Sequence, residues 1–424
     1  MYRGTSSPDL VVSMAKAGFM SYLGSGGLSF TQLEEKIKCI LNELTDNQSF
    51  GVNIMYDFMH PNKEIEMINL FLRMGVKNIE ASAFMQVSAP LVKFRARGLV
   101  ASSNGAINSI HRIQVKLSRP EVAKLFLSPA PDTIIDKLIT DNEITKEQAL
   151  LLKQVPVATE VCVESDSGGH TDRGVQSIIA PYIKHIRDEM YAKYKYQEEI
   201  ALGVAGGIGV PESAAAAFLL GADYIQTGSI NHCTPESGAS NLVKDMLSNI
   251  DIQDTAYAPA GDLFEMGGLV QVLKKGVVFP ARANRLFELY KKYDSIDDID
   301  NKTIQLLETH YFRKPLSKIY DECLEHYSQN EVVKTQADSK AKMAMIFRAY
   351  FYYSQRSAFQ GEIENLSNFQ VQCGPALGAF NQWVINTDLE SWRNRKVDII
   401  AHRLLEATAE LVNSTGRKLF SLSQ

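Results

Sequence analysis

Apolar and polar positions along the first 230 residues alternate between the two-residue period of strands and the 3.6-residue period of helices. Short apolar runs at 19–23, 50–54, 76–81, 112–116, 160–163, 200–205 and 224–227 predict strands. Segments of helical spacing separate most of these runs. Strand and helix alternating in this way predict a parallel sheet, and this many units favour a closed (β/α)8 TIM barrel.

The strand count falls one short of a closed barrel. Residues 1–3 would be the end of the eighth strand, whose body is largely missing, so we expect a trimmed N-terminus or a longer natural start. A polar insertion at about 127–157 interrupts the alternation and holds a predicted helix at 145–154.

The second part of the chain has a different pattern. After about residue 250 no further strand is predicted, and the helical segments are 262–274, 282–293, 303–311, 316–327, 338–356 and 388–414. We therefore predict a barrel domain at 1–255 and a helical subdomain at 256–424, acting as a lid and interaction surface. The aromatic run at 350–353 is interpreted as helix packing, and the Gly and Pro of 373–383 as a loop returning to a ligand.

Composition narrows the class of protein. A net charge of −5 without a basic stripe gives no indication of nucleic-acid binding. The five cysteines are scattered without CxxC pairs, so we expect neither a disulfide framework nor a metal site, and a reducing, cytoplasmic location. No apolar run approaches the roughly 18 residues of a membrane span.

Three successive predicted strands end in glycine-rich or hydroxyl-bearing loops. Glycine lacks a Cβ, so its backbone can approach a flat ligand closely. In parallel sheets these loops share the edge that carries the chemistry. We expect a flat, phosphate-bearing cofactor there, although paired glycines also occur in ordinary tight turns. The candidates are Gly168, Gly169, Gly206, Gly207, Gly228 and Ser229.

Two polar side chains end predicted strands at the same edge. Asn53 carries an amide that can donate to and accept from the edge of a ring, or could simply cap the following turn. Lys116 could stabilise negative charge on a reduced ring or meet a phosphate, or could be a solvated loop lysine.

His170 is the candidate catalytic residue. It follows the predicted strand 160–163 and could donate a proton or hold a substrate carbonyl beside a redox ring. The alternative is a histidine that caps its loop or bonds Asp166 or Asp172.

A set of motifs spans the chain, at 14–18, 26–29, 80–86, 118–123, around His170, and at 227–231, 254–261, 279–284, 374–383 and 390–395. Together they resemble the PfaD family, the FMN-dependent enoyl reductases of polyunsaturated fatty acid synthases. The same family serves trans-acyltransferase polyketide synthases as a free-standing enoyl reductase. The barrel half is similar, at greater distance, to nitronate monooxygenases and FMN-type enoyl-carrier-protein reductases.

The resemblance implies a flavin-bearing TIM barrel in which His170 is catalytic and Asn53 and Lys116 lie at the flavin. It places the phosphate at the later glycine loops. It also places the flavin against the backbone of the largely missing N-terminal strand, the eighth strand of the barrel. The residues concerned are Gly206, Gly207, Gly228 and Ser229 for the phosphate, and Met1 and Tyr2 for that backbone.

The implied function is a trans-acting enoyl-[acyl-carrier-protein] reductase that uses FMN and NADPH on α,β-unsaturated acyl thioesters in polyketide or polyunsaturated fatty acid biosynthesis. Its partners would be an acyl carrier protein and polyketide synthase modules, while the choice between monomer and homodimer stays open. A basic rim for the carrier protein is predicted at Lys274, Lys275, Arg282 and Arg285, unless these are solvated helix faces. The alternatives are a nitronate monooxygenase-type flavin oxygenase and a non-catalytic docking component of a megasynthase.

Overall fold

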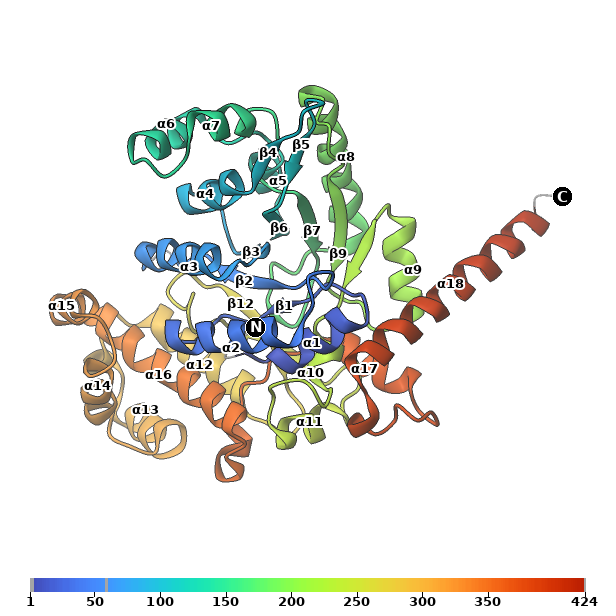
Figure 1. Cartoon of the computed structure of the whole chain (residues 1–424). Coiled ribbons are helices and arrows are strands. Elements are labelled where there is room, and N and C mark those ends of the chain that lie inside the picture. The colour runs from blue at the N-terminus through green and yellow to red at the C-terminus, as the bar shows by residue number, and fades with distance from the viewer. Residues whose placement is uncertain (1–3, 58–59, 423–424) are drawn as a thin grey trace. The chain divides into compact units, whose positions relative to one another are not determined.

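A computed structural model describes residues 4–57 and 60–422 (Figure 1). The chain divides into two compact units, each discontinuous in sequence. The first holds the residues up to Asp166, Arg173–Gly238 and the residues from Val384 onward. The second holds Ser167–Asp172 and Ala239–Trp383. The predicted domain boundary at residue 256 therefore does not separate these units. The segment that contains His170 belongs to the second unit, and the last helix belongs to the first unit.

The first unit is built on a sheet of seven strands, all paired in parallel, in the order β1-β2-β3-β6-β7-β9-β10. The strands are β1 Tyr22–Leu23, β2 Gly51–Met55, β3 Asn78–Ser82, β6 Arg112–Leu117, β7 Glu160–Glu164, β9 Ala201–Ala205 and β10 Tyr224–Gln226. All seven predicted strands are confirmed. The remnant of the eighth was predicted at residues 1–3, which lie outside the described residues.

The sheet is curled, as contacts between distant strands show. Glu80 on β3 accepts a hydrogen bond from Gln226 on β10, although three strands separate β3 from β10 in the sheet. Gln114 Nε2 on β6 donates to Tyr224 Oη, also on β10, at 2.7 Å. Side chains on one face of a flat sheet could not meet across several strands spaced about 4.8 Å apart. The inner face of the sheet therefore encloses a polar interior.

Helices follow the strands along the chain, in the alternation that the sequence predicted (Figure 1). Local signals place their ends. In α2, for example, the Ser29 hydroxyl accepts from the Gln32 N–H at 3.2 Å in a capping box, and Leu33, Ile37 and Ile40 form its buried face. The helices of this unit are α1 Pro8–Lys16, α2 Phe30–Glu43, α3 Pro61–Met74, α4 Ala89–Arg97, α5 Pro120–Phe126, α6 Asp132–Thr140, α7 Lys146–Leu152, α8 Gln176–Tyr194, α9 Pro211–Leu219, α10 Ser229–His232 and α18 Val397–Leu422.

Two features of this unit lie outside the strand–helix alternation. The hairpin β4 Leu99–Ala101 and β5 Ile107–Ser109 was not predicted. The insertion contains α6 in addition to the predicted helix, which corresponds to α7.

The second unit contains strands that the sequence pattern did not predict. A helix at 262–274 is wrong, because β12 Leu269–Leu273 pairs antiparallel with both β11 Thr255–Pro259 and β8 Gly169–His170. The β-branched Val270 and Val272 suit a strand. The run is too short to be assigned from its periodicity, so pairing with a strand on each side determines its structure.

The rest of the second unit is helical. Its helices are α11 Asn241–Leu247, α12 Phe279–Lys292, α13 Asn301–Leu306, α14 Leu316–Leu324, α15 Gln329–Ala337, α16 Ser339–Gln360 and α17 Pro375–Trp383, with a π-helical turn at Leu307–Phe312. Tyr350 and Phe351 are each 2% exposed and pack on Phe279, which confirms helix packing for these two residues of the aromatic run, whereas Tyr352 is exposed. The expected loop at 373–383 is wrong in its larger part, because α17 occupies it. Within the described residues, no helix is both long enough and apolar enough to cross a membrane.

Candidate functional site

Asn53 lies in the polar interior of the first unit. It sits on β2 directly opposite Glu80 on β3, and its side chain is 2% exposed. Its Nδ2 donates to Glu80 Oε1 at 2.9 Å and to Ser82 Oγ at 3.1 Å. The alternative that Asn53 caps a turn is wrong, because its amide is held by neighbouring strand residues.

Lys116, at the end of β6, belongs to the same interior. Its Nζ lies 3.1 Å from Glu164 Oε1 on the adjacent strand β7. Burial by itself would lower the pKa of Lys116, but the carboxylates of Glu164 and Glu80 outweigh it and hold this pKa above its ordinary value. The solvated-lysine alternative is wrong. The lysine is a charged group balanced by two carboxylates.

Glu80 links these two residues and was not singled out as a site residue from the sequence. Its side chain is fully buried. Burial by itself would raise the pKa of this carboxyl, but the Lys116 charge and hydrogen bonds from Gln226 and Ser82 outweigh it and lower the pKa. A signal was available, because an acid between the apolar Ile79 and Ala81 of a predicted strand requires a partner if it is buried.

Two amide oxygens in this cluster indicate what the interior could hold. Among the described residues, Asn53 Oδ1 and Gln226 Oε1 are buried and have no hydrogen-bond partner. A buried acceptor without a donor costs about 1–3 kcal/mol, so such atoms usually meet a ligand or water. A flavin ring has an N–H on its edge and carbonyl and nitrogen acceptors for a lysine. The residues present therefore fit a flavin.

The glycines of the predicted phosphate loops fall into two kinds. A Cβ built on Gly206 would lie 2.6 Å from Ser165 O, so this glycine is required by the packing of its own chain. Gly207 and Gly228 have nothing within 4 Å of such a Cβ, which leaves room for a ligand to approach. Gly228 is the N-cap of α10, and Ser229 is its first residue. The phosphate role of all four residues stays a prediction.

His170 belongs to the second unit, whereas Asn53, Glu80 and Lys116 belong to the first. It lies on β8, paired with Val270 of β12. Its Nε2 is 2.8 Å from Oδ1 of Asp262, a residue that sequence reasoning missed although it directly follows the 254–261 motif. Partial desolvation would raise the pKa of the exposed Asp262 carboxyl, but the hydrogen bond and charge of His170 outweigh it and lower the pKa. A carboxylate on Nε2 fixes the imidazole and leaves Nδ1 for proton transfer.

Gly168 has a structural reason to be glycine. Its Cβ would lie 2.6 Å from the backbone carbon of Cys373 and 2.7 Å from Gly374 N. Gly169 has a φ of +96°, which favours glycine whatever lies nearby. The cofactor role predicted for both glycines stays a prediction.

The four cations predicted to form the basic rim differ in their surroundings. Lys274, Lys275 and Arg285 are exposed. Arg282 instead donates to Asn368 Oδ1 and lies with its guanidinium 4.9 Å from the centre of the Tyr311 ring. Arg282 therefore has a structural role within the helical unit.

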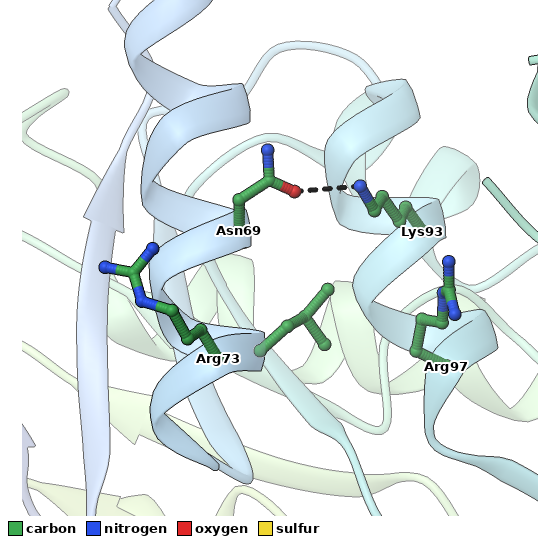
Figure 2. A pocket seen from close by; sticks show the side chains of 5 residues that line it. Asn69, Arg73, Lys93 and Arg97 are labelled. Carbon is green, nitrogen blue, oxygen red and sulfur yellow. Dashed lines mark hydrogen bonds between the residues drawn. The ribbon is translucent and has the colours of Figure 1, made fainter.

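A hollow of about 430 Å³ lies between α3 and α4 of the first unit, and its lining contains none of the predicted site residues. Figure 2 shows Asn69 Oδ1 accepting from Lys93 Nζ at 2.8 Å, with Arg73 and Arg97 beside them. These side chains come from the C-terminal halves of helices that return from the strand ends. The hollow therefore lies toward the amino ends of the strands, where barrel enzymes do not place their chemistry.

Comparison with known proteins gives the family. The chain is 48% identical over 423 residues to the polyketide biosynthesis protein PksE of Bacillus subtilis, covering 100% of this chain and 55% of that protein. It is 37% identical over 397 residues to one of the subunits of the polyunsaturated fatty acid synthase of a Thraustochytrium species, covering 92% of this chain and 26% of that protein. The chain thus spans about half the length, or less, of these relatives.

The crystal structure of the enoyl reductase domain of MlnA, from the macrolactin biosynthesis cluster of Bacillus amyloliquefaciens, superposes with a TM-score of 0.96. The identity is 43%, over 99% of this chain and 94% of that domain. The chain belongs to this enoyl reductase family. The family resemblance predicted from the motifs is confirmed.

Two more distant relatives share less of the sequence. FabK from Thermotoga maritima superposes with a TM-score of 0.58 at 17% identity, over 99% of this chain and 93% of FabK, which shows the fold. A probable nitronate monooxygenase of Staphylococcus saprophyticus is 26% identical over 262 residues, covering 59% of this chain and 69% of that protein. The predicted TIM-barrel class with a helical region is confirmed.

A family model matches part of the second unit. Residues 293–369 match the inserted helical domain of [acyl-carrier-protein] S-malonyltransferase. This segment runs from the end of α12 through α16 to the residues after η3 Ile363–Asn368.

Proposed function

We propose that this chain is a trans-acting enoyl reductase that reduces the C=C bond of α,β-unsaturated acyl thioesters carried on an acyl carrier protein. The observation that carries the proposal is the match to the MlnA enoyl reductase domain over 99% of the chain. We further propose FMN as the flavin and NADPH as the reductant. The balance is NADPH, one proton and the enoyl thioester giving NADP⁺ and the saturated thioester.

When bound, FMN would supply the chemistry of hydride transfer between the nicotinamide and the β-carbon of the substrate. Lys116 and the amide of Asn53 would hold the ring in the polar interior of the sheet. The open backbone at Gly207 and Gly228 would receive the phosphate, beside the hydroxyl of Ser229. Preorganised charges and donors of this kind are usually the largest contribution to catalysis.

His170 would supply the proton that the α-carbon needs after hydride addition. Its Nε2 faces the carboxylate of Asp262, so the protonated ring can release the proton from Nδ1 while the carboxylate stabilises the charge. General acid catalysis of this kind contributes about 10² to 10⁴ in rate.

The test is anaerobic stopped-flow absorbance of the FMN-loaded protein mixed with NADPH and a crotonyl-carrier-protein thioester. We expect NADPH oxidation that matches thioester reduction. His170→Ala should keep the yellow flavin spectrum and lose most turnover, about 10²-fold or more. A nitronate-type oxygenase would leave both substrates unchanged without oxygen, and a non-catalytic docking component would bind no FMN. Either outcome would refute the proposal.

The helical region would meet the carrier protein. We propose this role for the second unit because its residues 293–369 match a helical domain of an enzyme family named for an acyl-carrier-protein substrate. The exposed Lys274, Lys275 and Arg285 carry the sign of charge that suits an acidic carrier-protein surface.

A further inference from the structure

Two amide side chains in the interior of the first unit share one carboxylate. Asn53 Nδ2 on β2 donates to Glu80 Oε1 at 2.9 Å. Gln226 Nε2 on β10 donates to the other oxygen, Glu80 Oε2. Ser82 Oγ completes the set, donating to Glu80 Oε1 at 3.0 Å and accepting from Asn53. Glu80 therefore stands between two strands that lie far apart in the sheet.

The chemistry of Glu80 decides which way both amides point. An ionised carboxylate only accepts hydrogen bonds, so each amide must turn its NH₂ group toward Glu80. The charge of Lys116 keeps the carboxyl ionised despite its burial. Both amide oxygens must then point away from Glu80. These oxygens, Asn53 Oδ1 and Gln226 Oε1, are buried and without a partner among the described residues.

We propose that Glu80 is a positioning residue that holds the amides of Asn53 and Gln226 as acceptors, so that the cofactor site selects a ring edge carrying an N–H donor. The inference rests on the proposed function, in which the ligand is FMN. The oxidised flavin ring has a single N–H, at N3. A site whose buried acceptors are fixed in this way penalises a ring that lacks the donor, because the acceptor then stays unpaired.

Glu80→Gln changes this pattern without changing the size of the side chain. The new carboxamide has one acceptor oxygen and one donor NH₂, where the carboxylate had two acceptors. One of the two amides, Asn53 or Gln226, must then turn its oxygen toward residue 80 and its NH₂ toward the cofactor. The site would present one acceptor and one donor instead of two acceptors.

The experiment compares FMN with FMN methylated at N3, which lacks the donor. Each is titrated into flavin-free protein, and the dissociation constant is measured by quenching of flavin fluorescence. For the wild-type protein we expect FMN to bind about tenfold or more tightly than the methylated form. In Glu80→Gln that ratio should fall at least threefold, whereas any purely steric effect of the methyl group is present in both proteins and cancels.

The matched control is Glu160→Gln, which also removes a carboxylate from the sheet. Glu160 on β7 is paired with Arg112 Nε at 3.1 Å and, in the described residues, hydrogen-bonds neither amide. Its ratio should equal that of the wild type. If Glu80→Gln does not fold, as judged by circular dichroism, Ser82→Ala takes its place, because it removes one contact on Asn53 without removing a charge. The ratio should then fall about twofold.

The outcomes separate the two proposals. If the folded Glu80→Gln protein has the same ratio of dissociation constants for the two flavins as the wild type, the role of Glu80 is overturned and the reductase proposal still stands. The same holds for Ser82→Ala if that variant is used. An equal fall in Glu160→Gln also overturns it, because the effect would then be one of general charge. A wild-type protein that binds no FMN overturns both.

Discussion

The two adjacent glycines after β9 should respond differently to the same substitution. Gly206 has a φ of +88° and Gly207 a φ of +70°, so alanine is strained at both, by about 1–2 kcal/mol. Only at Gly206 does the new Cβ meet the chain, at 2.6 Å from both the carbonyl oxygen and the hydroxyl of Ser165. At Gly207 nothing lies within 4 Å.

Ser165 cannot move aside at low cost. Its N–H donates to Ala205 O at 2.9 Å, and its hydroxyl contacts Ala205 O at 2.9 Å and Gly206 O at 3.1 Å. Forcing extra atoms into such packing costs about 1–3 kcal/mol. We therefore expect Gly206→Ala to lower the free energy of unfolding by about 2–5 kcal/mol, and Gly207→Ala by only about 1–2 kcal/mol. A difference of about 2 kcal/mol is roughly thirtyfold in the unfolding equilibrium constant.

The assay is urea unfolding of the flavin-free proteins, followed by circular dichroism, so that cofactor binding does not add to stability. A second titration with FMN provides the opposite contrast. Gly207→Ala places a methyl group in the space where we predict the phosphate, so it should weaken FMN binding about tenfold while remaining the more stable variant. Equal unfolding midpoints, or a less stable Gly207→Ala, would refute the packing argument.

Three further predictions concern the other groups. Asp262→Asn should lower turnover about two- to fivefold at unchanged flavin content, because an exposed pair with His170 is worth no more than about 1 kcal/mol. Turnover equal to wild type would contradict this. The folded-state pKa of Glu80 is lowered, so its stabilisation is present above the ordinary value of 4.5 and is lost as pH falls through the folded pKa. The stability gap between wild type and Glu80→Gln, measured by urea unfolding, should therefore narrow as the pH falls below 4.5, and a constant gap would be evidence against the ionised carboxylate. Reversing the charges of Lys274 and Arg285 to glutamate should raise KM about tenfold for a carrier-protein thioester but not for a small pantetheine thioester, and equal KM changes would argue against docking there.

Each of these predictions has a matched control in the chain. Asp251→Asn alters an exposed acid of the same unit that is not paired with His170, and it should leave turnover unchanged. Reversing Lys137, an exposed lysine of the first unit, should not change KM for the carrier-protein thioester. For the acid titration the control is Glu160→Gln. It shows whether the stability gap to wild type narrows at low pH when any carboxylate of the sheet is removed.

The sequence by itself determined the local features of this protein. The seven parallel strands follow from short apolar runs separated by helical segments, because the side-chain period within one element depends only on its own residues. The positions of Asn53 and Lys116 in the sheet follow from the same pattern. The motifs along the chain were sufficient to indicate the family.

Only the tertiary structure decided which side chains meet. Glu80 and Gln226 are 146 residues apart and come together because the sheet curls, and His170 and Asp262 are 92 residues apart and meet beside the sheet formed by β8, β11 and β12. It also showed why residue 206 is a glycine, because a Cβ at this position would collide with the backbone of Ser165 rather than with a ligand. Contacts at such separations depend on how elements pack, and no local period carries that information.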